Sequence, residues 1–182
     1  YAFTNYSLGS KTAAFIGFKN FLRLFQDEVF LKSLAITLKY VLISVPLKLT
    51  FALLVAYLLT RPSRMVTFYR SLYYLPSLVG GSVAVALVWK QLFARKGLFN
   101  SVLANMDMST INWFGNQKLA LYPLILMSVW QFGSSMIIFA AGLKEIPVSY
   151  YEAARIDGAR GYQSFFRITL PCLSPIILYN LI

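Results

Sequence analysis

Long apolar runs alternate with shorter polar segments along most of the chain. Residues 34–59, 73–92 and 122–143 each supply the roughly 20 mostly apolar residues that a membrane-spanning helix requires. Residues 171–182 resemble the first half of another such segment. The pattern predicts an all-α, polytopic transmembrane helical bundle with three complete spans and the start of a fourth. We interpret the chain as a fragment of one transmembrane domain.

Residues 1–33 mix polar and aromatic positions, and we expect this segment to lie outside the membrane. Apolar residues recur at helical spacing between positions 18 and 34. This spacing is typical of an amphipathic helix that lies on the membrane surface. The sequence therefore predicts an external segment with one interfacial helix before the first span.

The turn Arg61-Pro62-Ser63-Arg64 between the first two spans is strongly basic. Short loops rich in lysine and arginine usually face the cytoplasm. This topology places residues 144–170 in the cytoplasm and residues 93–121 outside. Asn100 is among the residues expected to form turns in the outer loop.

The composition indicates that lipid is the main solvent of the chain. Hydrophobic residues make up 58% and charged residues 13%, whereas soluble domains contain about 25% charged residues. The mean hydropathy is +0.64. The net charge of +11 is spread between the apolar runs and forms no patch. These features exclude a nucleic-acid partner and predict contact with the anionic lipids of a bilayer.

The residues needed for common catalytic and metal sites are missing from the sequence. There is no histidine, Cys172 is the lone cysteine, and no glycine-rich phosphate-binding loop is present. The sequence thus predicts no catalytic residue, no metal and no cofactor. None of the six acidic residues lies in a predicted span, which argues against an ion-coupled secondary carrier because such carriers usually keep a titratable group near the midplane.

Two predicted spans contain polar or small residues that could line a substrate path. Ser77 and Gly81 lie in the second span, and Trp130, Gln131 and Ser135 lie in the third. Hydroxyl and amide groups beside an indole can bond to a sugar and stack against it. Small and hydroxyl residues are equally common where membrane helices pack. Both interpretations stay open for these five residues.

Lys48 is the ionisable residue nearest the middle of a predicted span. Thr37 and Ser44 share its helix face, which indicates a polar stripe turned towards protein or water. The alternative is that Lys48 extends its ammonium group to the interface and has no further role.

The predicted cytoplasmic segment contains signals for a short, well-bounded helix. Pro147 suits a helix start, and Ser149 with Glu152 three residues later forms a capping-box pattern. Gly158 permits the positive φ that ends many helices. A second short helix is expected at residues 162–168. Close approach by another protein is favoured by four small residues, Ala153, Ala154, Gly158 and Ala159.

The same segment resembles a known motif. Glu152-Ala153-Ala154, followed by Asp157-Gly158-Ala159 and Leu170-Pro171, resembles the EAA motif of permease subunits in bacterial binding-protein-dependent ABC importers of type I. Tyr74-Leu75-Pro76 and Trp113-Phe114 are similar to the carbohydrate branch of that family, which includes maltose and glycerol-phosphate permeases.

The resemblance implies a multi-pass permease subunit of the bacterial inner membrane that forms half of a translocation pore and is not itself an enzyme. Its implied partners are a dimer of ATP-binding cassette ATPases, a second permease subunit and an extracytoplasmic solute-binding protein. A permease for a polyol or glycerol phosphate is the alternative within the family, and an ion-coupled carrier is the alternative outside it. The implied ATPase-docking residues are Glu152, Ala153, Ala154, Asp157, Gly158 and Ala159.

Overall fold

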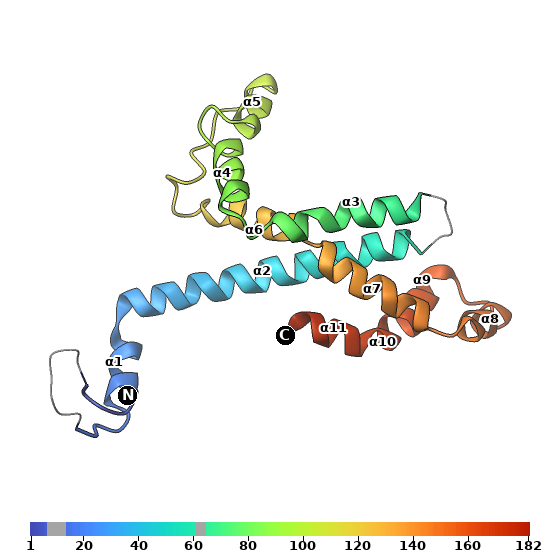
Figure 1. The fold of residues 1–182 in the computed structure, drawn as a ribbon, viewed down its shortest axis with the longest axis horizontal. Coiled ribbons are helices and arrows are strands. Elements are labelled where there is room, and N and C mark those ends of the chain that lie inside the picture. Colours follow the sequence, from blue (N-terminus) through green and yellow to red (C-terminus); the bar gives the residue numbers. More distant parts are fainter. Residues whose placement is uncertain (7–13, 61–64) are drawn as a thin grey trace. The chain divides into compact units, whose positions relative to one another are not determined.

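The computed structural model describes residues 1–6, 14–60 and 65–182. Most of the described residues are helical, as predicted (Figure 1). The chain divides into two units, Tyr1–Leu42 and Ile43–Ile182. The long helix α2, Glu28–Leu58, belongs to both. The basic turn on which the predicted topology depends lies outside the described residues.

The first unit contains α1, Lys19–Gln26, and the start of α2. The single interfacial helix expected between positions 18 and 34 is wrong in its extent, because a new helix begins after Asp27. The carboxylate Oδ1 of Asp27 accepts hydrogen bonds from the backbone N–H groups of Val29 at 2.8 Å and Phe30 at 3.3 Å. An aspartate that satisfies free N–H groups in this way starts a helix.

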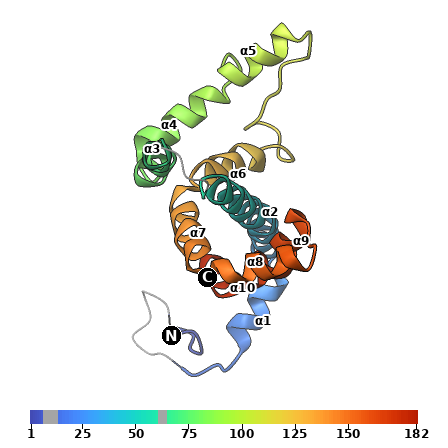
Figure 2. The ribbon, with the colours of Figure 1, turned by 90° about the vertical axis from the view of Figure 1, so that its right-hand side faces the viewer.

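The second unit begins within α2 and is built from short helices in close succession (Figure 2). They are α3 Val66–Val79, α4 Val83–Leu92, α5 Leu98–Asn105, α6 Leu121–Trp130, α7 Gly133–Glu145, α8 Val148–Ile156, α9 Gly161–Ser164, the π-helix η1 Phe165–Thr169, α10 Leu170–Cys172 and α11 Ser174–Leu181.

Among the described helices, α2 alone is long and apolar enough to cross a membrane by itself. Three bent pairs reach that length together: α3 with α4 at 99°, α6 with α7 at 43°, and the segment from α9 to α10 with α11 at 61°. The predicted apolar segments 73–92 and 122–143 are therefore not single helices. Their assignment as membrane spans stays a prediction.

The sharpest break, between α3 and α4, has a local cause. It contains Gly80 and Gly81, which favour helix termination, and Ser82, whose Oγ accepts the Val85 N–H at 3.3 Å and caps α4. The apolar run therefore does not form one continuous helix, because these three residues end α3 and start α4.

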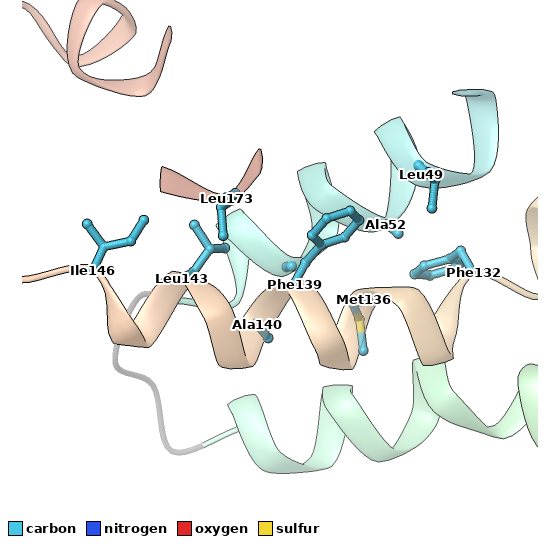
Figure 3. Close-up of a cluster of buried hydrophobic side chains, with 10 residues drawn as sticks. Leu49, Ala52, Phe132, Met136, Phe139, Ala140, Leu143, Ile146 and Leu173 are labelled. Atoms are coloured by element: carbon cyan, nitrogen blue, oxygen red, sulfur yellow. The ribbon is translucent and has the colours of Figure 1, made fainter. Parts of the chain in front are cut away.

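Helix α7 is the centre of the packed core (Figure 3). It contacts α3 and α11, and its buried residues join a cluster with α2. Ala52 and Ala56 of α2 are fully buried and belong to this cluster. Phe132 meets Phe51 edge to face, with 4.8 Å between ring centroids. The remaining buried members are Leu49, Met136, Phe139, Ala140, Leu143, Ile146 and Leu173.

The segment between α4 and α6 is organised by Asn100. This residue was expected in a turn, but it lies inside α5 and is 1% exposed. Its Nδ2 donates to the carbonyl oxygens of Ala94 at 3.1 Å and Ile111 at 2.9 Å, and its Oδ1 accepts from the Ile111 N–H at 2.9 Å. One buried amide thus joins three parts of the segment.

Candidate functional site

Helix α8 carries the first of the two predicted sites. Its N-terminal boundary follows Ile146, which is buried in the core, and Pro147, which occupies the N-cap position. The predicted capping box is wrong: no side chain caps the helix, and Ser149 lies inside its first turn. The physical reason is that Pro147 takes the non-helical N-cap conformation and the helix begins at Val148. Ser149 is therefore already helical and cannot occupy the N-cap position.

The C-terminus of α8 matches the sequence prediction. Gly158 has a φ of +75°. Its N–H donates to the Arg155 carbonyl at 3.0 Å, and the Ala159 N–H donates to the Ala154 carbonyl at 2.8 Å. This pair of bonds defines the Schellman motif, in which glycine adopts the left-handed conformation without cost. The turn fixes the direction in which the chain leaves α8.

Tyr151 attaches α8 to the rest of the second unit. Its side chain packs against the core, and its hydroxyl lies 2.9 Å from Oγ1 of Thr169 in the π-helix. Thr169 is 1% exposed. A hydrogen bond between two such hydroxyls holds α8 to the chain segment that follows it. Sequence reasoning missed Tyr151, although its three-residue spacing from Ala154 places both on one helix face.

The outer surface of α8 presents apolar side chains to the surroundings. Ile156 is 87% exposed and Val148 is 69% exposed. Glu152 lies between them at four-residue spacing and is exposed together with Ala153. A large apolar side chain that the core does not use is a common feature of protein-binding surfaces. Val148 and Ile156 were not among the predicted docking residues.

The other predicted docking residues lie around a hollow beside the α8 turn. The expected helix at 162–168 is replaced by α9 and the π-helix, which continue into α10. The side-chain Oε1 of Gln163 accepts the Arg160 N–H at 2.7 Å and so fixes the start of α9. The hollow has a volume of ≈ 320 Å³ and is lined by Ala154, Asp157, Gly158, Ala159, Gln163, Ser164, Arg167 and Ile168.

The second predicted site is the polar path. Ser77 of α3 lies against the break between α6 and α7. Its Oγ donates to the Gln131 carbonyl at 3.1 Å and accepts the Ser134 N–H at 3.0 Å. Close contact is possible here because Gly133 faces the Tyr73 carbonyl, where a Cβ would clash. Ser77 therefore satisfies backbone groups that the helix break leaves free.

The other path residues occupy different environments. The Trp130 ring lies 5.8 Å from the ring of Trp89, which is not among the predicted path residues. The Gln131 side chain covers Gly80, where a Cβ would collide with it. Ser135 is 8% exposed in α7, whereas Gly81 faces open space. The structure thus brings Ser77 and Gln131 into direct contact. The use of all five as a substrate path stays a prediction.

The predicted polar stripe on α2 does not have one uniform environment. Ser44 is 1% exposed and Lys48 is half-buried. The Thr37 hydroxyl is exposed and donates to the Ser33 carbonyl of its own helix at 2.9 Å. The role of Lys48 stays open between the two interpretations.

Comparison with known proteins gives consistent matches. Residues 30–182 match the family described as "Binding-protein-dependent transport system inner membrane component". The chain is 50% identical over 100% of its length to the "Probable ABC transporter permease protein YesP" of Bacillus subtilis, of which it covers 59%. It is 33% identical to the "Lactose transport system permease protein LacF" of Rhizobium radiobacter, with 92% of this chain and 57% of that protein covered.

A solved structure shares the fold. It is a bacterial ABC transporter involved in the import of the acidic polysaccharide alginate, and one of its chains matches with a TM-score of 0.78 and 27% identity. The match covers 92% of this chain and 59% of that chain. The chain therefore spans less than two thirds of the length of these relatives.

Proposed function

Because the chain belongs to the family of inner membrane components of binding-protein-dependent transport systems, we propose that it is part of the permease subunit of an ATP-driven carbohydrate importer. The permease forms half of the translocation pore, and a separate ATPase subunit hydrolyses ATP. The observation that carries the proposal is α8, a short exposed helix with an ordered turn at its end and a buried attachment to the core.

In this proposal, α8 is the coupling helix and docks into the ATPase in the cytoplasm. Glu152 and Ala153 lie on its exposed surface, and Ala154, Asp157, Gly158 and Ala159 border the adjoining hollow. Exposed Ile156 adds an apolar contact to this set. Closure of the ATPase dimer moves α8, and the bundle changes between inward- and outward-facing states.

The attachment of α8 explains how such a movement reaches the membrane helices. Tyr151 links α8 to Thr169, and Ile146 places the start of α8 at the end of α7. A rigid, packed connection transmits displacement because a close-packed core deforms little. A second permease subunit completes the pore, and an extracytoplasmic solute-binding protein delivers the substrate.

Carbohydrate is the proposed substrate class because the matched relatives include a lactose permease and an alginate importer. Trp130 and Gln131 are the first candidates for substrate contact, since indole and amide groups suit sugar recognition. Ser77 holds the backbone of Gln131 in place through a hydrogen bond to its carbonyl. Gly81 and Ser135 complete the proposed path.

ATP-dependent uptake tests the proposal. The full-length permease is reconstituted with its co-purifying partners in vesicles, and uptake of labelled oligosaccharides is measured with ATP, without ATP, and with an ionophore that removes ion gradients. We expect uptake that needs ATP and survives the ionophore. Uptake of a polyol or glycerol phosphate in place of oligosaccharides would overturn the substrate class, and uptake driven by an ion gradient would overturn the importer mechanism.

A further inference from the structure

The three tryptophans of the chain are far apart in sequence and belong to one cluster of aromatic rings. Trp89 lies in α4, Trp113 lies between α5 and α6, and Trp130 is the last residue of α6. The Trp89 ring lies 5.8 Å from the Trp130 ring and 5.8 Å from the Phe93 ring. Phe93 also meets Trp113 edge to face at 5.4 Å. Trp89 therefore connects Trp130, a proposed substrate contact, to the rings of the segment between α4 and α6.

Phe93 gives the Trp89 ring a rigid support. The two rings are nearly parallel, with 15° between their planes. Phe93 is 4% exposed and stacks on Phe99 with 4.2 Å between centroids. The buried amide of Asn100 bonds to the carbonyl of Ala94, the residue after Phe93. Because a close-packed ring has little freedom to move, the folded segment sets the position of Trp89.

The contacts that α3 and α4 make with Trp130 and Gln131 complement one another. Ser77 bonds to the Gln131 carbonyl, and the Gln131 side chain covers Gly80. These two contacts hold the backbone and the amide at the break, but they do not orient the indole. Among the described residues, the aromatic ring that Trp130 contacts is Trp89, with 58° between the planes. Aromatic pairs prefer defined geometries, so this contact favours one orientation of the Trp130 ring.

We propose that Trp89 is a positioning residue, which orients the Trp130 indole for contact with the sugar and does not bind the sugar itself. The inference rests on the proposed function for the role of Trp130. Holding a side chain in its bound orientation before the ligand arrives lowers the entropy that binding costs. A contact between two aromatic rings favours its preferred geometry by a factor of about 2 to 10. This factor sets the expected size of the effect on sugar affinity.

A double-mutant cycle tests the positioning role. The probe is the labelled oligosaccharide that the uptake assay identifies as transported, and its binding to the purified full-length transporter is measured by equilibrium dialysis without the solute-binding protein. Trp89→Leu should weaken binding by about 2- to 10-fold, and Trp89→Phe, which keeps a ring, should fall between Trp89→Leu and the parent protein. Trp130→Leu should also weaken binding, and adding Trp89→Leu to it should cause no further loss, because Trp89 acts through Trp130.

Fluorine NMR of transporter labelled with 5-fluorotryptophan reports the environment of Trp130 directly. Its resonance is identified by its loss in Trp130→Leu. Trp89→Leu should shift or broaden this resonance. Trp113→Leu is the matched control, because it removes the same side chain from the same cluster, and the Trp113 ring contacts Phe93 and not Trp130. The Trp130 resonance should stay at its parent position in this control.

The outcomes separate the inference from the proposed function. An unchanged Trp130 resonance in Trp89→Leu, or equal shifts in Trp89→Leu and Trp113→Leu, overturns the inference. A further loss of affinity when Trp89→Leu is added to Trp130→Leu also overturns it, because Trp89 would then contact the sugar itself. If the Trp130 resonance depends on Trp89 but Trp130→Leu binds the sugar as tightly as the parent protein, the ring contact stands and the sugar contact in the proposed function is wrong.

Discussion

The left-handed turn at Gly158 gives a quantitative test of the α8 loop. Its φ is +75°, and an added Cβ would meet open space. Substitution by alanine therefore costs conformational energy and causes no clash. The left-handed conformation costs an L-residue about 1–2 kcal/mol, which corresponds to a ~5- to 30-fold rise in the population of opened turns. Asparagine tolerates this conformation better, so Gly158→Asn is expected to fall between the parent protein and Gly158→Ala.

Gly161 is a matched control three residues further along. A Cβ there also meets open space, but its φ lies outside the left-handed range. Gly161→Ala should leave the turn unchanged or stabilise the loop slightly, because alanine restricts the unfolded chain. Hydrogen exchange of the Gly158-turn amides, followed by mass spectrometry in the assembled transporter, measures the open population.

The expected order of exchange rates is Gly158→Ala above Gly158→Asn, with Gly161→Ala at the parent level. ATP-dependent uptake should decline in the same order, because the proposed ATPase docking requires the closed turn. Equal exchange in Gly158→Ala and Gly161→Ala would refute the conformational argument. Faster exchange in Gly158→Ala with undiminished uptake would instead refute the docking role of the turn.

Three further substitutions test side-chain hydrogen bonds by their effect on thermal stability, uptake or proteolysis. Tyr151→Phe removes the hydroxyl that joins α8 to the π-helix. It should lower the free energy of unfolding by about 1–2 kcal/mol and reduce uptake per ATP hydrolysed. Tyr150→Phe, at a half-exposed position, should change neither. Ser77→Ala removes the side-chain partner of two backbone groups at the α6–α7 break and should lower the free energy of unfolding by about 0.5–1.5 kcal/mol. The control is Ser71→Ala, whose hydroxyl bonds within its own helix. Asn100→Ala should expose the segment between α5 and α6 to limited proteolysis in detergent, and an unchanged cleavage pattern would contradict its structural role.

Features that depend on local sequence could be predicted. The apolar length of α2 predicted a helix able to cross a membrane, and Gly158 predicted a positive φ. Both follow from neighbouring residues alone. The family resemblance was likewise carried by a continuous motif in the segment that forms α8 and the turn after it.

Features that depend on distant contacts could not be predicted. The hydroxyl of Ser77 supports a helix break more than 50 residues later in the chain, and nothing around Gln131 indicates that partner. In the sequence, Asn100 resembles a turn residue, and its hydrogen bond to the Ile111 backbone is apparent only in the folded structure. In the same way, Tyr151 becomes an anchor only when the π-helix brings Thr169 within hydrogen-bonding distance.

Helix α7 connects the two proposed sites. One end begins at Gly133, beside the bonds from Ser77 to the α6–α7 break, and the other leads through Ile146 into α8. Its 13 residues span about 20 Å at ~1.5 Å per residue. Because α7 also packs against α2, α3 and α11, a displacement at α8 has a continuous packed route to Gln131. The bond between Tyr151 and Thr169 adds a second attachment, which joins α8 to the bent segment that follows it. In the proposed mechanism, the helix breaks therefore allow one short helix, α7, to connect the docking helix α8 with the proposed substrate contact at Gln131.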